Sequence, residues 1–216
     1  MKKIDISKLA HVVDHPVIRH KLTMLRKKET NHAEFRAYLS EIASLLAYEA
    51  TRDLVLRDVK IETPLEKTTQ PIVGEKINII SIQRAGSGML EGMLQMLPFA
   101  RVGHVGIYRD KFLHATIEYY FRIPEKSKGQ RVFLIDPLLA TGDTAVAVID
   151  RLKQYEVGPI TFVSVLSAPE GIIKLKTAHP DVKIITTNVD RQLSPKGYIL
   201  PGLGDAGDRL FDTLGN

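Results

Sequence analysis

The amino-acid sequence predicts an α/β fold, with a doubly wound, mainly parallel sheet flanked by helices, and three observations lead to this prediction. First, 216 residues are enough for one large core, so a single domain over residues 1–216 is expected. Second, from Lys76 onward short apolar runs alternate with helix-like stretches. Third, each run ends in a glycine-rich or polar turn, which is typical of buried parallel strands followed by crossover helices.

The first part of the chain, about residues 1–60, is expected to be an N-terminal helical extension. Apolar residues largely follow helical spacing through Glu34–Asp53, and Asn31 offers a signal for the start of this helix. The segment Glu62–Gly74 contains two prolines and is interpreted either as a linker or as an extended arm. The core is expected over about residues 72–216.

Four strands and three helices are predicted in the core. The strands are Ile77–Ile82, Arg131–Asp136, Ile160–Leu166 and Val182–Val189. The helix-like stretches read MLEGMLQML, TAVAVIDRLKQY and EGIIKLKTA. Because ligands bind at the carboxyl ends of strands in such sheets, functional residues are expected in the segments that follow the apolar runs. These segments are Arg84–Gly88, Tyr108–Asp110, Asp136–Thr144 and, beyond the last strand, Pro201–Asp208.

The composition excludes several kinds of chemistry. The chain has no cysteine, which excludes disulfides, thiolate metal sites and cysteine nucleophiles. It has neither a signal-peptide pattern nor an apolar run that could span a bilayer, which predicts a cytoplasmic protein with no membrane partner. The net charge of +5 suits an anionic ligand. Much of this charge lies in the first quarter, where a solvated helix face explains it, so nucleic acid is not the expected partner.

The segment IDPLLATGDTA suits a phosphate ligand. A buried strand ends at Asp136, and a short loop then enters a helix near Thr144. Unpaired backbone N–H groups and the helix dipole at such a start favour a phosphate monoester, which Thr141–Thr144 could bind while Asp136 faces the sugar hydroxyls. The alternative is an ordinary strand-to-helix turn with Asp143 or Thr144 as the N-cap.

The segment SIQRAGSG places an arginine and small residues at another strand end. Arginine binds phosphate oxygens through several N–H groups, and small neighbours let the backbone approach a diphosphate. Gly86–Gly92 also resembles a loosened dinucleotide fingerprint, with Arg109 or Asp110 near the ribose. In a third interpretation, these glycines only allow close packing of helix and strand.

The segment GYILPGLGDAGDRLF is dense in glycine and is expected to be too broken for regular structure. It would form successive turns or present backbone groups to a ligand. No G-x-x-x-x-G-K-[ST] pattern occurs, which removes the common nucleoside triphosphatase interpretation, and no H-E-x-x-H pattern occurs either. Structural or exposed roles are expected for His15, His20, His104 and His179.

Together these motifs resemble the uracil phosphoribosyltransferase family, from about His15 to Phe211. The DP-x-x-ATG segment is similar to the phosphoribosyl diphosphate loop of the type I phosphoribosyltransferase fold, and PGLGDAGDRLF is similar to the uracil branch alone. The other stretches that carry the resemblance are HPVIRHKLTMLR, LLAYEATRDL, RAGSGMLEGML, ARVGHVGIYRD, IEYY, SAPEGI and AHPDV.

The resemblance implies an enzyme that joins uracil to phosphoribosyl diphosphate, giving UMP and pyrophosphate. It implies that Arg84 and Arg109 hold the diphosphate, and that the hairpin Lys111–Pro124 is the family's cover over the active site. Asp136, Arg109 and Asp205 are the implied catalytic residues. The whole set implied for phosphoribosyl diphosphate is Arg84, Ala85, Gly86, Arg109, Asp136, Pro137, Leu138, Leu139, Ala140, Thr141, Gly142, Asp143, Thr144 and Asp205.

The same resemblance implies a uracil site in the segment 188–211. Its implied residues, acting mainly through backbone groups, are Tyr198, Ile199, Gly204, Asp205 and Ala206. Mg²⁺ is the implied cofactor; it would arrive on the diphosphate without a direct protein ligand and would face Asp205 through water. A homodimer or larger homo-oligomer is implied as well, with GTP as a candidate allosteric ligand.

Two positions depart from the family pattern. Gln83 precedes Arg84 where an apolar residue is usual, and Asp143-Thr144 replaces the more frequent Gly-Ser. A carboxylate facing a dianionic phosphate would be repelled, so the side chain of Asp143 is expected to point outward. Two other functions stay open: an oxidoreductase with a nucleotide cofactor bound at Gly86–Gly92, and an RNA-binding pyrimidine regulator on the same fold.

Overall fold

A computed structural model describes residues 5–109 and 116–213 of the chain. Its helices and strands are a 3-10 helix Ile6–Lys8, β1 His11–Val12, α1 Pro16–Arg26, α2 His32–Ala50, β2 Leu56–Glu62, β3 Lys67–Val73, β4 Ile77–Gln83, α3 Ser87–Met96, β5 Arg101–Arg109, β6 Thr116–Arg122, β7 Arg131–Ile135, β8 Leu138–Leu139, α4 Asp143–Gln154, β9 Ile160–Ser167, α5 Pro169–Ala178, β10 Lys183–Val189, β11 Gln192–Leu193, β12 Ile199–Leu200 and α6 Ala206–Phe211.

The central sheet confirms the predicted α/β fold. Its strand order is β1-β10-β9-β7-β4-β5-β6, with β8 paired to β9. Every neighbouring pair is parallel except β5 and β6, which are antiparallel. The chain adds β5 on one side of β4 and β7 on the other, so the winding direction reverses between β4 and β7. The carboxyl ends of strands beside such a reversal form the usual ligand crevice of an open α/β sheet.

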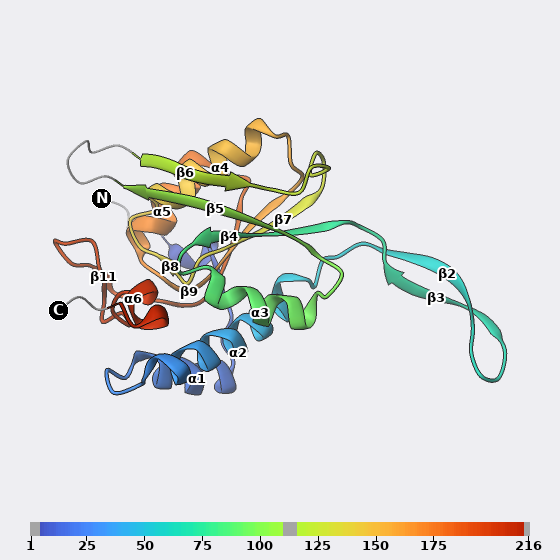
Figure 1. The fold of residues 1–216 in the computed structure, drawn as a ribbon, viewed down its shortest axis with the longest axis horizontal. Coiled ribbons are helices and arrows are strands. Elements are labelled where there is room, and N and C mark those ends of the chain that lie inside the picture. The colour runs from blue at the N-terminus through green and yellow to red at the C-terminus, as the bar shows by residue number, and fades with distance from the viewer. Residues whose placement is uncertain (1–4, 110–115, 214–216) are drawn as a thin grey trace.

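Helices cover both faces of the sheet (Figure 1). One buried cluster joins Ile77 and Ile79 of β4 to α1, α2, α3 and α6. A second cluster joins Ile80 and Ile82 of the same strand to α4 and α5. Because successive strand residues point to opposite faces and both faces are covered, β4 is buried almost throughout and has isoleucines on both faces, which is the sequence pattern of a buried parallel strand.

The helix α2 begins where the sequence predicts. The side chain of Asn31 accepts a hydrogen bond from Glu34 N at 3.0 Å, and the Glu34 carboxylate accepts one from Asn31 N at 3.3 Å. This capping box satisfies two of the backbone N–H groups at the helix start. A Cβ atom on Gly92 of α3 would overlap the carbonyl oxygen of Ser40 in α2, so this glycine permits close packing of two helices.

The N-terminal extension is not helical throughout, which corrects that part of the prediction. Its strand β1 pairs with β10 of the core, with His11 opposite Ile185. Its last residues belong to β2, which pairs with β3 in an antiparallel hairpin. Strand pairing therefore favours extended backbone at both ends of the N-terminal extension. The spacing of apolar residues within the extension cannot predict this, because the partner strands β10 and β3 lie outside it.

The segment interpreted as a linker or an arm is this hairpin, which projects away from the rest of the molecule (Figure 1). Pro71 lies opposite Asp58 within it. A proline is tolerated there because both strands of a two-stranded ribbon are edge strands. On an edge strand, an N–H that faces solvent makes no hydrogen bond between strands, so its absence costs little. Within the described part of the chain, no helix is long and apolar enough to cross a membrane.

Candidate active site

A small cavity of about 90 Å³ lies at the carboxyl end of β7. Both β7 and β4 end at the reversal of the sheet, so Asp136 and Arg84 follow the two strands that flank it. The cavity is lined by the loop that was singled out from the sequence, namely Asp136, Leu138, Leu139, Ala140, Thr141, Gly142, Thr144 and Ala145.

The start of α4 differs from the simple capped turn that was the alternative. The helix begins at Asp143, and its N-cap is Gly142 with a φ of 83° and no side-chain hydrogen bond. Glycine is favoured at such a left-handed position. The interpretation of Asp143 or Thr144 as the N-cap is therefore wrong. Gly142 provides no side-chain cap, and Asp143 N donates to Thr141 Oγ1 at 3.4 Å.

The loop rests on α5. A Cβ atom on Gly171 would overlap the carbonyl oxygen of Ala140, and a Cβ on Gly142 would lie 3.0 Å from the carbonyl oxygen of Gly171. Gly171 therefore lets the loop pack directly on the first turn of α5. This role was not predicted from the sequence, although a glycine in the first turn of a helix is a signal of close packing.

Asp136 lies at the base of the cavity, with part of its surface open to it. Burial of the carboxyl group raises its pKa from 3.8 to about 7. The N–H of Leu138, which donates to Oδ1 at 3.5 Å, lowers this pKa, and the negative charge of Asp205 raises it. Asp205, in the glycine-rich C-terminal segment, is therefore near enough to Asp136 to act on its charge.

Arg84 lies between β4 and α6. Its guanidinium donates to Asp208 Oδ1 at 3.3 Å and to Thr213 Oγ1 at 3.4 Å, and it lies over the ring of Phe211. The side chain is 53% exposed, so its N–H groups stay accessible to an anionic ligand. Just after it, a Cβ on Gly86 would lie 2.6 Å from two backbone oxygens, those of Ile82 and Ile135.

Packing thus explains the glycines of the candidate dinucleotide fingerprint. Gly86 fits against β4 and β7, Gly88 against Leu39 and Leu210, and Gly92 against α2. Gln83, one of the two departures from the family pattern, forms a hydrogen bond within the sheet: its Nε2 lies 2.8 Å from Nδ1 of His104 on β5. His104 therefore has the structural role that was expected of it.

The C-terminal segment is more regular than expected. It contains β12 and the six-residue helix α6, so the expectation of no regular structure is wrong there. Asp205 caps α6 by accepting a hydrogen bond from Asp208 N at 3.0 Å. Ahead of it, Gly202 and Gly204 have φ values of 65° and 85°. These two glycines precede α6, which contains only Gly207, and the cap at Asp205 offsets the low helix propensity of that one glycine.

The implied uracil residues lie along this segment. Ile199 and Ala206 are buried, Gly204 and Asp205 are exposed, and Tyr198 is about half exposed. A Cβ on the neighbouring Gly197 would lie 3.6 Å from Thr141 Cγ2, so this segment also reaches the loop after β7.

Two charged groups with no signal in the sequence, the buried Asp190 and the partly buried Arg209, hold this segment on the N-terminal helices. Asp190 accepts hydrogen bonds from both terminal nitrogens of Arg26, at 2.7 and 2.6 Å, and from Gly202 N at 2.8 Å. Arg209 donates to the carbonyl oxygens of Leu25 at 2.6 Å and Leu203 at 2.8 Å. Both arginines stand in quoted motifs, but their partners are too distant in sequence to be predicted.

The remaining expected features concern Asp143 and the cover. The Asp143 carboxylate forms an ion pair with Lys174 of α5, and so it is directed toward that helix.

Arg109 is the last residue of β5, opposite Thr116 of β6. Part of the hairpin expected as a cover is thus β6, whereas Asp110 and residues 111–115 lie outside the described residues.

Comparisons with known proteins show which family the chain resembles. The sequence model of the uracil phosphoribosyltransferase family matches residues 12–213. A uracil phosphoribosyltransferase of Myxococcus xanthus is 52% identical over 203 residues, covering 94% of this chain and 96% of that protein. One of Polaromonas naphthalenivorans is 50% identical over 204 residues, covering 94% of this chain and 98% of that protein.

Solved structures show the same fold. The AQ2163 protein of Aquifex aeolicus superposes with a TM-score of 0.89 at 36% identity, covering 94% of this chain and 97% of that one. An adenine phosphoribosyltransferase of Leishmania donovani has a TM-score of 0.51 at 17% identity, covering 81% and 71% respectively, and so shares the fold alone. With a family model matched over residues 12–213 and relatives at about half identity, the chain belongs to the uracil phosphoribosyltransferase family.

Proposed function

We propose that the protein transfers the phosphoribosyl group of phosphoribosyl diphosphate to N1 of uracil, with UMP and pyrophosphate as products. The observation that carries this proposal is the convergence of three segments: the loop after β7, Arg84 after β4, and the glycine-rich segment around Asp205. The test is incubation with phosphoribosyl diphosphate, Mg²⁺ and one base at a time, chosen from uracil, orotate, hypoxanthine and adenine. Nucleotide formation is expected with uracil, and formation with another base instead would contradict the proposal.

The loop Ala140–Thr144 would bind the 5′-phosphate, with Pro137–Leu139 forming the rest of the same turn. Its support is the uncapped start of α4 beside the cavity, where N–H groups and the helix dipole favour an anion. Arg84, with the backbone of Ala85 and Gly86, would hold the diphosphate. Arg109 would assist from the end of β5, as the resemblance implies.

The reaction needs positioning and charge stabilisation more than a nucleophilic side chain. The bond between C1 and the diphosphate oxygen breaks, the bond from uracil N1 to C1 forms, and the N1 proton is released. Positive charge develops on the ribose ring meanwhile, and the Asp136 carboxylate would hold the ribose hydroxyls beside that charge. Tyr198, Ile199, Gly204 and Ala206 would align uracil N1 with C1, which removes much of the entropic barrier.

Mg²⁺ fits the oxygen ligands of this site. Asp136 and Asp205 are close enough to interact electrostatically, and carboxylate oxygens suit a hard cation. In the described part of the chain there is no cluster of three or more His, Cys, Asp or Glu that could hold a metal alone. We infer that the metal arrives with the substrate and meets Asp205 through water. Bound there, Mg²⁺ would stabilise negative charge on the departing pyrophosphate.

Replacing Asp136 by Asn tests the central role. We expect Asp136→Asn to lower kcat at pH 8 by more than tenfold, because the neutral amide cannot stabilise the charge that develops on the ribose ring. We also expect the ligand-free variant to melt at a higher temperature than the wild type at pH 8. Near-normal activity combined with a lower melting temperature would instead make Asp136 a structural residue.

The sign of the stability effect follows from the raised pKa. Because the folded protein holds the Asp136 proton up to about pH 7 while the unfolded chain releases it near pH 4, stability falls as pH rises through this window. The full cost above pH 7 is at most about 4 kcal/mol. The gain in melting temperature from Asp136→Asn should therefore be larger at pH 8 than at pH 5, measured by calorimetry.

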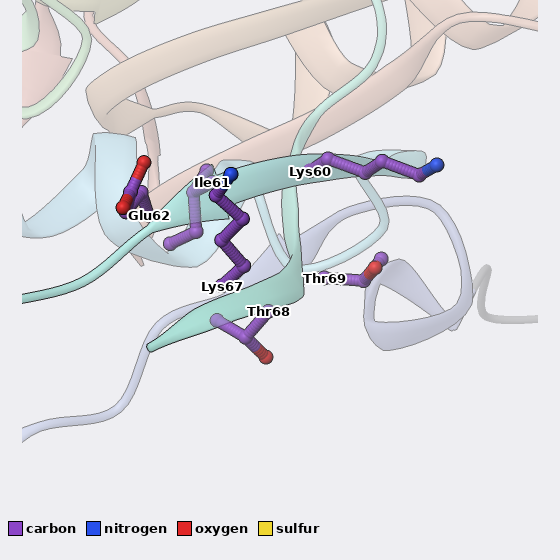
Figure 2. Close-up of a pocket in the computed structure, with 6 residues that line it drawn as sticks. All are labelled: Lys60, Ile61, Glu62, Lys67, Thr68 and Thr69. Carbon is purple, nitrogen blue, oxygen red and sulfur yellow. The ribbon is translucent and has the colours of Figure 1, made fainter. Parts of the chain in front are cut away.

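A homodimer is the second part of the proposal, and the β2–β3 hairpin supports it. An isolated two-stranded hairpin is marginal in water. Figure 2 shows a hollow on it whose lining side chains, including Ile61 and Lys67, come from both strands. Nearby Leu65 is 95% exposed, and other exposed apolar residues of the arm and of the adjoining surface are Tyr48, Val55, Leu56, Ile72, Met96 and Phe99. We propose that a second copy of the chain covers this arm.

We expect the double change Leu56→Asp and Leu65→Asp to convert a dimer into a monomer, because each change places a charge in an apolar contact. Sedimentation velocity at micromolar concentration measures the mass directly. Val17→Asp, at an exposed apolar residue of α1, is the control that should stay dimeric. A monomeric wild type, or a double variant that remains dimeric, would contradict the proposed arm contact.

The other functions lack comparable support. The glycines of Gly86–Gly92 are explained by packing, which leaves the oxidoreductase without its motif. An RNA-binding regulator would not require the glycine-rich segment, and salt-sensitive RNA affinity would be its signature. Regulation by GTP and a cytoplasmic location remain predictions.

A further inference from the structure

Arg209 of α6 reaches from the C-terminal segment back to the N-terminal helices. Its Nη1 donates hydrogen bonds to the carbonyl oxygens of Leu25 at 2.6 Å and Leu203 at 2.8 Å, and its Nη2 donates to that of Lys27 at 2.6 Å. The guanidinium carbon lies 4.5 Å from the centre of the buried ring of Phe35. One side chain thus joins the end of α1 and the turn after it to the C-terminal segment.

The same residue fixes both ends of the short turn that leads into α6. The side chain of Arg209 binds the carbonyl oxygen of Leu203, and its backbone N–H donates to the carbonyl oxygen of Asp205 at 3.0 Å. Between these two carbonyls lies Gly204, with a φ of 85°, and a Cβ built on it would lie 3.5 Å from Arg209 Cδ. Among the described residues, no hydrogen bond between backbone groups involves Gly204. The turn is therefore held at its ends, while the peptide groups of Gly204 stay available to a ligand.

Arg26 holds the preceding carbonyl group from the same side. Its Nη1 donates to the carbonyl oxygen of Gly202 at 2.7 Å, so the carbonyl groups of Gly202 and Leu203 are both bound by arginines. The two arginines differ in their partners. Arg26 is paired with the carboxylate of Asp190, whereas Arg209 pairs with no carboxylate in the described part of the chain and binds carbonyl oxygens. Because a partly buried cation is costly unless hydrogen bonds compensate it, charge pairing cannot account for the place of Arg209.

We propose that Arg209 is a positioning residue for the base: by holding the Leu203 carbonyl against the turn after α1, it fixes the orientation of the peptide groups from Gly204 to Ala206 that would bind uracil. This inference rests on the proposed function. Arg209 acts through the backbone and not by contact with the base. The end of α1 takes part in base binding as well, because its carbonyl oxygens hold the guanidinium group in place.

Binding of UMP and of ribose 5-phosphate, each measured by calorimetry, tests this role. The two ligands share the phosphate and the ribose and differ by the base, so the ratio of their Kd values isolates base binding. Arg209→Met keeps the aliphatic part of the side chain and removes its hydrogen-bond donors. We expect this variant to bind UMP about tenfold more weakly and ribose 5-phosphate with an unchanged Kd, because the loss of one hydrogen bond to a charged group has about this effect. Steady-state kinetics should show the same split, with KM raised for uracil but not for phosphoribosyl diphosphate.

Three further variants separate this effect from general ones. Arg209→Lys keeps the charge and some donors and should give an intermediate UMP affinity. Arg36→Met changes the net charge equally and removes another arginine bond to α6, that from Arg36 to the Leu210 carbonyl oxygen, so it should leave both Kd values unchanged. Leu152→Ala, at a buried residue of α4 on the other face of the sheet, should lower the melting temperature without changing the ratio of Kd values. Melting temperatures of all variants check folding.

The other outcomes are decisive as well. If the wild type forms no UMP from uracil and phosphoribosyl diphosphate, the proposed function is wrong. If the wild type forms UMP but Arg209→Met leaves the ratio of Kd values unchanged, only the role of Arg209 is wrong. If Arg209→Met weakens both ligands equally, or Leu152→Ala changes the ratio as much, Arg209 supports the fold in general and base positioning is refuted. If Arg209→Met does not fold, Arg209→Lys decides: a raised ratio supports the proposal, and an unchanged ratio refutes it.

Discussion

Cytosine is expected to be used with a kcat/KM about 10⁴-fold or more below that of uracil. The proposed base site consists mainly of backbone groups along Ile199 to Ala206, whose hydrogen-bond donors and acceptors cannot be exchanged. Uracil N3–H donates a hydrogen bond, whereas the unprotonated N3 of cytosine accepts one. A mismatched base would leave buried polar groups unsatisfied, and sites built on hydrogen bonds reject such analogues by about 10⁴ to 10⁵.

Steady-state rates of nucleotide formation with the two bases measure this ratio. The cytosine must be free of uracil, because a trace of the better substrate would set an artificial floor. Thymine serves as a control, since it keeps the same hydrogen-bonding edge and differs by one methyl group. Comparable kcat/KM values for uracil and cytosine would contradict the assignment of the base site.

Asp190→Ala is expected to destabilise the protein by about 3 to 5 kcal/mol. The change leaves the guanidinium of Arg26 without its buried carboxylate, and uncompensated buried charges have costs of this size. Denaturant unfolding of the variant and the wild type measures the difference. Asp181→Ala is a matched control, because Asp181 forms an exposed pair with Lys153 whose loss should cost less than about 1 kcal/mol.

The pH dependence of Asp190 gives an independent check. Burial raises its pKa, but hydrogen bonds from Arg26 and Gly202 outweigh burial and hold the pKa below its ordinary value. The stability that Asp190 contributes is therefore complete above pH 4 and is lost as pH falls through the lowered pKa. The difference between Asp190→Ala and wild type should shrink in acid. Equal stability of the two proteins at pH 7 would mean that the pair has no net effect.

Local patterns in the sequence predicted most of the fold. The strands β4, β7, β9 and β10 were evident because burial on both faces leaves short, mainly apolar runs with few charged residues. Asn31 identified the start of α2 because a capping box needs only residues three apart. The hairpin of β2 and β3 was ambiguous, because its strands lack the apolar alternation that burial on one face imposes.

The sequence predicted those parts of the candidate site that a single continuous segment forms. The loop Asp136–Thr144 contains its own strand end, left-handed glycine and helix start, and so its shape follows from its sequence. The contacts of Arg26 with Asp190 and of Lys174 with Asp143 join residues from different helices and loops. No spacing in the sequence encodes such pairs, because they arise only when the sheet brings the segments together.

The parallel pairing of β1 with β10 also bears on how the chain reaches its native state. His11 pairs with Ile185, and the residues that hold α1 in place lie beyond β10, at Asp190 and Arg209. During synthesis α1 can pack on α2 as soon as α2 has formed, since Lys21 pairs with Glu41, but β1 and the Arg26 side chain meet their partners only after most of the core has been made. Such high contact order slows folding and leaves apolar helix faces open to aggregation meanwhile. The contacts of β1 and α1 with residues at and beyond β10 are therefore among the last that can form.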